Sequence, residues 1–237
     1  MRVISLVPSW TETLIEAGVD VVGRARFCIH PEDKIQKIAI VGGTKNIDIE
    51  KIKILNPDMV FLDREENTLE ISQLLSVHGI PWTATHVVDL ESCAQELKRM
   101  SEVFQFNSTL LKMSDDYLKI LNSDFLNLGM NASEFKKINY VIWKKPWMCV
   151  GRNTFIGDVL SRFRIDLDLK EQKYFEISDA DLKKSYCLFS SEPYPFEKEI
   201  EELKKAGFQG QMIDGENFSW FGVRNLKFMN SFLTNLK

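Results

Sequence analysis

Short apolar runs alternate with amphipathic segments over the first hundred residues of the chain. The apolar runs have the length of strands, and the amphipathic segments repeat apolar residues every three or four positions, which is typical of helices packed on a core. The pattern predicts strands at 2–7, 21–27, 59–62 and 82–87, and helices at 11–18, 48–55, 68–78 and 90–104. Strands that alternate with helices in this way predict a parallel sheet covered by helices.

A longer amphipathic segment follows, from Ser108 to Leu128, with no internal Gly or Pro. It predicts one helix of roughly 30 Å. A second α/β run comes after it, with strands expected at 138–143, 187–190 and 211–213 and helices at 154–163, 196–206 and 224–236. We therefore expect an α/β protein of two Rossmann-like lobes with parallel sheets, residues 1–107 and 129–237, joined by one long backbone helix at 108–128.

Composition narrows the class of protein. The 237 residues are 44% hydrophobic and 27% charged, which is typical of a globular chain. The net charge of -4 argues against a dedicated nucleic-acid binder, which normally has a basic excess. No run of about 18 apolar residues predicts a membrane span, and the first residues do not have the pattern of a signal peptide. The sequence as given indicates a cytoplasmic protein, or a periplasmic one if a leader has been removed.

The sequence lacks the common nucleotide-binding and catalytic motifs. No GxGxxG follows the first strand, and neither GxxxxGK[ST] nor GxSxG occurs. The four cysteines are far apart, which favours reduced, buried thiols over a disulfide frame or a zinc ribbon: Cys28, Cys93, Cys149 and Cys187. All three histidines precede residue 87, so a metal held directly by both lobes is not expected. We assign no catalytic residue and no metal ligand.

The chemistry that remains lies in loops that follow predicted strands. In parallel α/β sheets, ligands bind beyond the carboxyl ends of the strands. Four of the five tryptophans lie in these loops, together with several cations, which would suit a large organic ligand with negative or amide groups. The alternative is that the tryptophans brace the lobes. The candidate ligand-binding residues are Ser9, Trp10, Phe27, Arg64, Trp143, Lys144, Trp147, Arg152, Tyr194, Trp220 and Arg224.

Two other functions stay open at this point. The chain could be a cytoplasmic enzyme or carrier, with Cys28 and His30 as a nucleophile–base pair or with Arg64, Glu65 and Glu66 as its polar loop. It could also be a sensor whose carboxylates dock a partner protein. A buried thiol with a capping histidine is the commoner arrangement for the first pair.

Several motifs resemble those of the class III periplasmic binding proteins, the helical-backbone receptors for cobalamin and iron–siderophore complexes. The residues that carry the resemblance are the run SLVPSWTE at 5–12, Gly18, Val22-Gly23, LNPDMV at 55–60 and HGIPW at 78–82. The resemblance is strong over 2–105, moderate through the long helix and weaker in the second lobe. It is more specific for the fold than for the ligand.

The resemblance implies a binding protein and not an enzyme. It implies that cobalamin or an iron–siderophore-like metal chelate is held in the cleft between the lobes, with no directly bound cofactor, by a monomer that delivers it to an ABC permease. In the family, an acidic residue of each lobe pairs with permease arginines, which tends to steer docking. The matching candidates are Glu65, Glu66 or Glu70 in the first lobe and Glu192 or Glu197 in the second. No nucleic-acid partner and no membrane insertion are expected.

Overall fold

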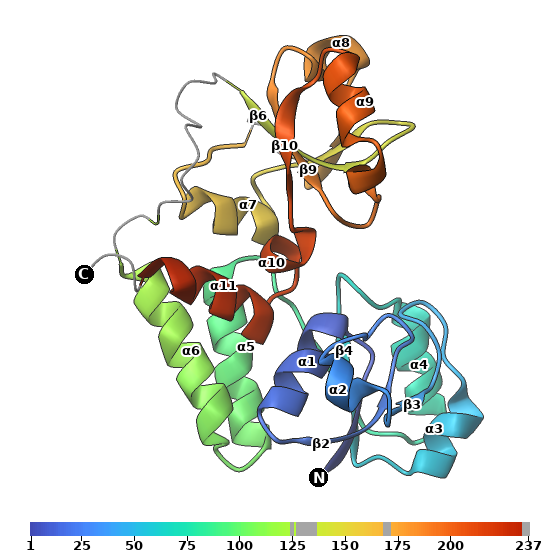
Figure 1. Cartoon of the computed structure of the whole chain (residues 1–237). Coiled ribbons are helices and arrows are strands. Elements are labelled where there is room, and N and C mark those ends of the chain that lie inside the picture. Colours follow the sequence, from blue (N-terminus) through green and yellow to red (C-terminus); the bar gives the residue numbers. More distant parts are fainter. Residues whose placement is uncertain (124–125, 127–136, 168–171, 234–237) are drawn as a thin grey trace. The chain divides into compact units, whose positions relative to one another are not determined.

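The computed structural model describes residues 1–123, 126, 137–167 and 172–233 (Figure 1). The chain divides into two compact units. We call residues 1–87, 91–119 and 221–226 the N-terminal unit, and residues 88–90, 120–220 and 227–237 the C-terminal unit. The three-part division expected from the sequence stays a prediction. These units differ from it chiefly because residues 221–226 group with the N-terminal residues.

The N-terminal unit is built on a five-stranded parallel sheet with strand order β3-β2-β1-β4-β5. The strands are β1 (Arg2–Ser5), β2 (Asp20–Arg24), β3 (Ala39–Ile40), β4 (Met59–Asp63) and β5 (Trp82–Thr85). The helices are α1 (Pro8–Glu16), α2 (Glu32–Ile35), α3 (Ile49–Leu55), α4 (Leu69–Val77), α5 (Leu90–Val103) and α6 (Ser108–Leu121). The pattern missed α2 and β3 because elements of four and two residues are too short to show a period.

One core of this unit lies between the sheet and its helices. Ile4 of β1, Leu6 just after β1 and Leu62 of β4 pack with Ile52 of α3 and Leu75 of α4, and all five side chains are buried. Full burial of each such side chain contributes about 1.5–3 kcal/mol. The core therefore uses the strands and helices that the apolar pattern predicts.

The start of α1 differs from the prediction. Pro8, Ser9 and Trp10 form the first turn of the helix and not a separate turn. Proline is favoured at this position because its fixed φ suits the helix and its missing N–H would have no partner there. Thr11, the predicted first residue of this helix, lies inside it, and its hydroxyl donates back to the Val7 carbonyl at 2.9 Å.

The predicted long helix is shorter than expected. It corresponds to α6, which ends at Leu121 and is followed by a bend at Ser123. The guanidinium of Arg162 donates to the carbonyls of Ile120 and Ser123 at 2.9 and 2.7 Å, so side-chain bonds satisfy backbone groups at this helix end. Residues 124, 125, 127 and 128 of the predicted helix lie outside the described residues.

The C-terminal unit contains a second five-stranded sheet with strand order β10-β9-β6-β7-β8. Its strands are β6 (Ile138–Trp143), β7 (Met148–Val150), β8 (Tyr174–Glu176), β9 (Tyr186–Ser190) and β10 (Gln209–Ile213). β10, β9 and β6 are parallel, whereas β7 and β8 are antiparallel to their neighbours. The predicted α/β class is confirmed. The two antiparallel strands were not expected, because three residues with one or two buried side chains give too weak a pattern.

The helices of this unit also refine the prediction. They are α7 (Phe155–Ser161), α8 (Asp179–Leu182), the 3-10 helix Phe196–Lys198, α9 (Ile200–Lys205), α10 (Gly215–Ser219) and α11 (Val223–Leu233). The single helix expected over 196–206 is divided at Glu199. The loop expected before Arg224 contains α10, which is capped by Asp214. Residues 234–236 of the predicted last helix lie outside the described residues.

The return of residues 221–226 to the N-terminal unit rests on buried polar contacts. The hydroxyl of Tyr117 in α6 accepts from the Gly222 N–H at 3.0 Å and lies 2.9 Å from the Gly222 carbonyl and 3.1 Å from Oδ1 of Asn225. The Val223 N–H donates to Thr13 Oγ1 at 3.0 Å. Gly222 has φ +84°, and a Cβ there would lie 2.2 Å from Thr13 Oγ1, so the close approach to α1 requires glycine.

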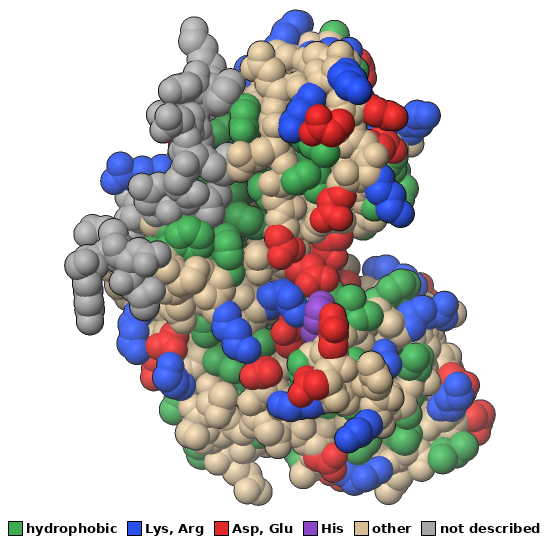
Figure 2. Space-filling view, viewed as in Figure 1, with side chains coloured by type: hydrophobic (Ala, Val, Ile, Leu, Met, Phe, Trp, Pro, Cys, Tyr) green, Lys and Arg blue, Asp and Glu red, His purple; other side chains and the backbone are tan. Residues whose placement is uncertain are grey.

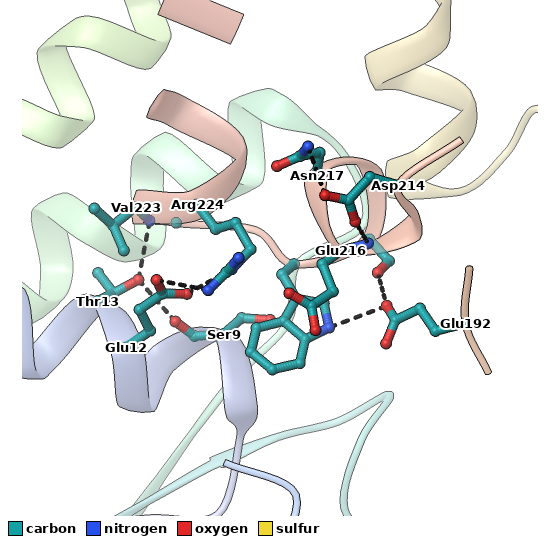
Figure 3. A network of polar contacts seen from close by, with 12 residues as sticks. Ser9, Glu12, Thr13, Glu192, Asp214, Glu216, Asn217, Val223 and Arg224 are labelled. Atoms are coloured by element: carbon teal, nitrogen blue, oxygen red, sulfur yellow. Dashed lines mark hydrogen bonds and ion pairs between the residues drawn. The ribbon is translucent and has the colours of Figure 1, made fainter. Parts of the chain in front are cut away.

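The same segment carries an ion pair and an aromatic contact with α1. Arg224 donates from Nε and Nη2 to the two carboxylate oxygens of Glu12 at 2.8 and 3.0 Å (Figure 3). The Phe221 and Trp10 rings lie 4.8 Å apart, centroid to centroid. A segment more than 200 residues from α1 thus completes the N-terminal unit.

Within the described parts of the chain, no helix is long and apolar enough to span a bilayer.

We expect Tyr117→Phe to lower the free energy of unfolding by about 1–3 kcal/mol, because the buried polar groups of Gly222 and Asn225 lose their partner. Urea denaturation measures the change. The control is Tyr174→Phe, whose ring is half exposed, and it should stay within about 0.5 kcal/mol of wild type. Equal stabilities for wild type and Tyr117→Phe would contradict the role of this hydroxyl.

Candidate functional site

In the N-terminal unit, a series of buried hydrogen bonds connects the carboxyl ends of β4 and β5 with α1. The indole N–H of Trp10 donates to Thr85 Oγ1 at 2.8 Å, and the Thr85 hydroxyl donates to Asp63 Oδ2 at 2.6 Å. Oδ1 of Asp63 accepts from the Glu65 N–H at 2.9 Å. Burial raises the pKa of Asp63, while the Thr85 hydrogen bond opposes the shift. These contacts fix the loop that follows β4.

Two predicted ligand residues of this unit are therefore structural. Trp10 is completely buried and uses its indole N–H within the protein, so no face of the ring is open to a ligand. Ser9 is buried in the first turn of α1. Trp10 follows the first strand, as the sequence indicates, but its side chain turns into the protein and not toward a ligand.

Other side chains at the same edge are exposed. Phe27 is 55% exposed, and the Arg26 guanidinium lies 6.0 Å from the centre of its ring. Arg64 follows β4 and is exposed, and its guanidinium makes no ion pair with any residue that the structure describes. His86, after β5, lies 3.4 Å from the Glu65 carboxylate. This edge presents an aromatic ring and cations to solvent.

The predicted docking carboxylates of this unit differ in exposure. Glu66 is half-buried, and its carbonyl accepts from Lys45 Nζ at 2.6 Å. Glu70 is exposed in the first turn of α4, where its own backbone N–H and the Thr68 hydroxyl lower its pKa. Glu70 therefore remains charged and accessible at neutral pH.

The nucleophile–base pair considered from the sequence is not supported. Cys28 is completely buried, and burial raises its pKa to about 11. The Thr11 hydroxyl lies 3.0 Å from its sulfur. The thiol is neutral near pH 7, and the thiolate is the reactive form of cysteine. All four cysteines are free and buried, which confirms the expectation of reduced, buried thiols.

In the C-terminal unit, β6 and β7 form a hairpin whose loop carries several candidate residues. Trp143 is 43% exposed, and its ring meets that of Tyr194 edge-on at 5.5 Å. Lys144 pairs with Glu199, and the Tyr194 hydroxyl donates to the same carboxylate. Lys144 lowers the pKa of Glu199, and the pair holds the loop in place. The exposed indole of Trp143 is thus held by Tyr194 and by a loop that the Lys144–Glu199 pair fixes.

Trp147, in contrast, packs inside this unit. Its ring stacks on Phe196 at 6.1 Å, and its indole N–H donates to Asp179 Oδ1 at 2.9 Å. Arg152, which precedes α7, is exposed, and no described residue pairs with its guanidinium. Trp143 and Arg152 are the predicted ligand residues that this unit leaves most open.

Glu192, a predicted docking residue, has an internal role. One of its oxygens accepts from the Trp220 indole N–H at 3.0 Å and from the Ser219 hydroxyl at 2.5 Å (Figure 3). Burial raises the pKa of Glu192, and the carboxylates of Glu216 and Asp214 add to the shift. Trp220 is itself buried, so neither residue presents its functional group to a partner. Glu197, in the 3-10 helix, is exposed.

Arg224 is a further residue whose position differs from the expected role, because its guanidinium is paired with Glu12 and not presented to a ligand. No local sequence pattern points to Glu12 as its partner, since 212 positions separate the two.

Basic and acidic side chains are interspersed on the face drawn in Figure 2. Among the residues that the structure describes, no three His, Cys, Asp or Glu side chains come close enough together to hold a metal ion.

Comparison with curated proteins finds binding proteins. The chain is 29% identical over 167 residues to the vitamin B12-binding protein of Salmonella typhimurium; the match covers 65% of this chain and 62% of that protein. It is 23% identical over 170 residues to YvrC of Bacillus subtilis, a substrate-binding lipoprotein of an ABC transporter, covering 68% of this chain and 52% of YvrC. The chain thus matches less than two thirds of each relative's length. No family model matches.

Solved structures match over nearly the whole chain. The periplasmic vitamin B12-binding protein BtuF of Vibrio cholerae has a TM-score of 0.72 at 18% identity, covering 98% of this chain and 95% of BtuF. The chain has the fold of the class III periplasmic binding proteins. The heme-binding protein HutB of the same organism has a TM-score of 0.77 at 15% identity, covering 100% of this chain and 98% of HutB. The family resemblance inferred from the first lobe is confirmed for the fold.

We expect Glu192→Ala to lower the free energy of unfolding by about 1–3 kcal/mol, because the Trp220 indole and the Ser219 hydroxyl lose their acceptor. Glu192→Gln is the matched control. It keeps an acceptor oxygen and removes a charge beside Glu216 and Asp214, so it should be at least as stable as wild type at pH 7.

The pH dependence follows from the raised pKa of Glu192. Because its pKa is higher in the folded than in the unfolded state, Glu192 contributes most to the stability of the fold at a pH below its unfolded pKa. This contribution is lost as the pH rises through the folded-state pKa. The advantage of Glu192→Gln in urea denaturation should therefore grow from pH 4 to pH 7. An alanine variant as stable as the glutamine variant would rule out this role.

Proposed function

We propose that the chain is a substrate-binding protein of the ABC-transporter type, with cobalamin or another metal chelate as its ligand. The observation that carries the proposal is the agreement between a matched vitamin B12-binding protein and a fold shared over almost the full chain with metal-chelate receptors. A heme-binding protein and the Fe3+–Desferal-bound siderophore-binding protein FhuD of Vibrio cholerae are among the matched structures. Heme and ferric siderophores are therefore the alternative ligands to cobalamin.

The side chains of the site support a large, partly apolar ligand. Phe27 and Trp143 expose large parts of their rings at the carboxyl ends of β2 and β6, and Arg152, after β7, is a cation with no ion-pair partner among the described residues. Aromatic rings provide large contact areas with little entropy to lose, and arginine binds carboxylate or amide oxygens. We infer that each of these side chains is available to a ligand within its own unit. Tyr194, which braces Trp143, acts as a positioning residue.

The partner and the compartment follow from the same proposal. The protein binds its ligand without chemical change, needs no resident cofactor and acts as a monomer that docks on a permease, without nucleic acid or membrane insertion. The exposed carboxylates of Glu70 and Glu197 are the docking residues, since Glu66 is half-buried and Glu192 is engaged internally. Relatives described as periplasmic or as lipoproteins favour a site of action outside the cytoplasmic membrane over the cytoplasmic location expected from the sequence.

We expect one of three ligands, cyanocobalamin, hemin or ferric desferrioxamine, to raise the melting temperature and to bind with a saturable change in its absorption spectrum. A ligand that binds the folded but not the unfolded state raises the free energy of unfolding by RT ln(1 + [L]/Kd). Phe27→Ala and Trp143→Ala should each weaken binding about five- to thirtyfold, because each removes aromatic contact area worth about 1–2 kcal/mol.

The control is Phe106→Ala, which removes another exposed phenylalanine, located after α5 and far along the chain from these loops. Its affinity should equal that of wild type. If none of the three ligands binds, the receptor proposal fails. If binding occurs but Phe27→Ala and Trp143→Ala behave as Phe106→Ala does, the assignment of these two rings is wrong.

A further inference from the structure

A cavity of about 390 Å³ lies in the N-terminal unit, between the edge strand β5 and helix α4. Leu62 and Ala84 form its apolar floor, and they are direct neighbours in the β4–β5 register. Trp82 lies two residues before Ala84 on the same face of the strand. The volume falls in the range of small-molecule sites, which run from about 300 to 1,000 Å³.

The rim of the cavity exposes large apolar side chains. Leu69, at the start of α4, is 69% exposed, and Trp82 is 38% exposed. The Trp82 indole N–H donates to Ser76 Oγ at 2.8 Å, which fixes the plane of the ring. The Ser72 hydroxyl donates to the Leu69 carbonyl at 2.7 Å, so its donor is used within the helix. The apolar wall is therefore ordered by contacts of the protein itself and stays open to solvent.

One charged group at the cavity is available for a ligand. Arg64 lines it and is exposed, and within the described chain its guanidinium has no ion-pair partner. Asp63 also lines the cavity, but it is almost completely buried and its oxygens accept from Thr85 and from the Glu65 N–H. The charge that the cavity presents is thus that of one arginine beside an aromatic wall.

We propose that this cavity is a binding site for a small aromatic carboxylate. The ring lies against Trp82 over the floor of Leu62 and Ala84, and the carboxylate pairs with the Arg64 guanidinium. An arginine can bind a carboxylate through two parallel N–H···O bonds, and offset or edge-to-face packing on an indole contributes further. The inference concerns the N-terminal unit alone and does not rest on the proposed receptor function.

The test uses 1-naphthoate as the probe and the full chain labelled with 15N. Trp82→Phe identifies the indole N–H signal of Trp82 among the five tryptophans. Titration with 1-naphthoate should shift this signal in a saturable way and leave the buried Trp10 signal in place. Arg64→Gln should weaken the apparent affinity about five- to tenfold, and the neutral analogue 1-naphthamide should bind wild type with a similar loss.

Lys98→Gln is the matched charge control, since Lys98 is another exposed cation of this unit and does not line the cavity. It should bind 1-naphthoate as wild type does. Ala84→Leu, which fills the floor, should abolish the shift, and its circular dichroism spectrum checks that it folds. An unmoved Trp82 signal would overturn the proposal, as would equal affinities for Arg64→Gln and wild type or a general shift of all indole signals.

Discussion

The buried contacts of residues 221–226 with α1 and α6 are the constraint on which the rest of the structure depends. The Tyr117 hydroxyl satisfies the backbone of Gly222, Thr13 accepts from Val223, and Glu12 pairs with Arg224. Each contact joins residues more than 100 positions apart, and most of the groups are removed from water. Loss of one partner leaves the other buried and unsatisfied, which makes such contacts expensive to break. The N-terminal unit is therefore incomplete without a segment near the end of the chain.

This constraint also determines which side chains are free for a ligand. Trp10 and Arg224 are used to join the C-terminal segment to α1, and Trp220 is used to hold Glu192. What remains open is a smaller set of exposed side chains, above all the rings of Phe27 and Trp143 after β2 and at the end of β6, and the Arg152 cation after β7.

The sequence predicted the α/β class, most of the strands and the family of the fold, because apolar periods and the SLVPSWTE and LNPDMV runs are local features. It could not predict which loop residues turn inward. The direction of Trp10 depends on Thr85, and that of Arg224 depends on Glu12, and neither partner is near in sequence. The short antiparallel strands β7 and β8 were missed because their pairing, and not their composition, makes them strands. Phe27 and Trp143, named as candidates from their loop positions, are exposed in the structure.

Native-state hydrogen exchange in low concentrations of denaturant tests the central claim most directly. If residues 221–226 complete the N-terminal unit, the Gly222 and Val223 amides, which donate to Tyr117 and Thr13, will exchange with the same free energy and the same denaturant dependence as the amides of β1 and β4. Exchange of these two amides at the rate of an unprotected loop, or together with the amides of β9 and β10 at a different free energy, would contradict the account.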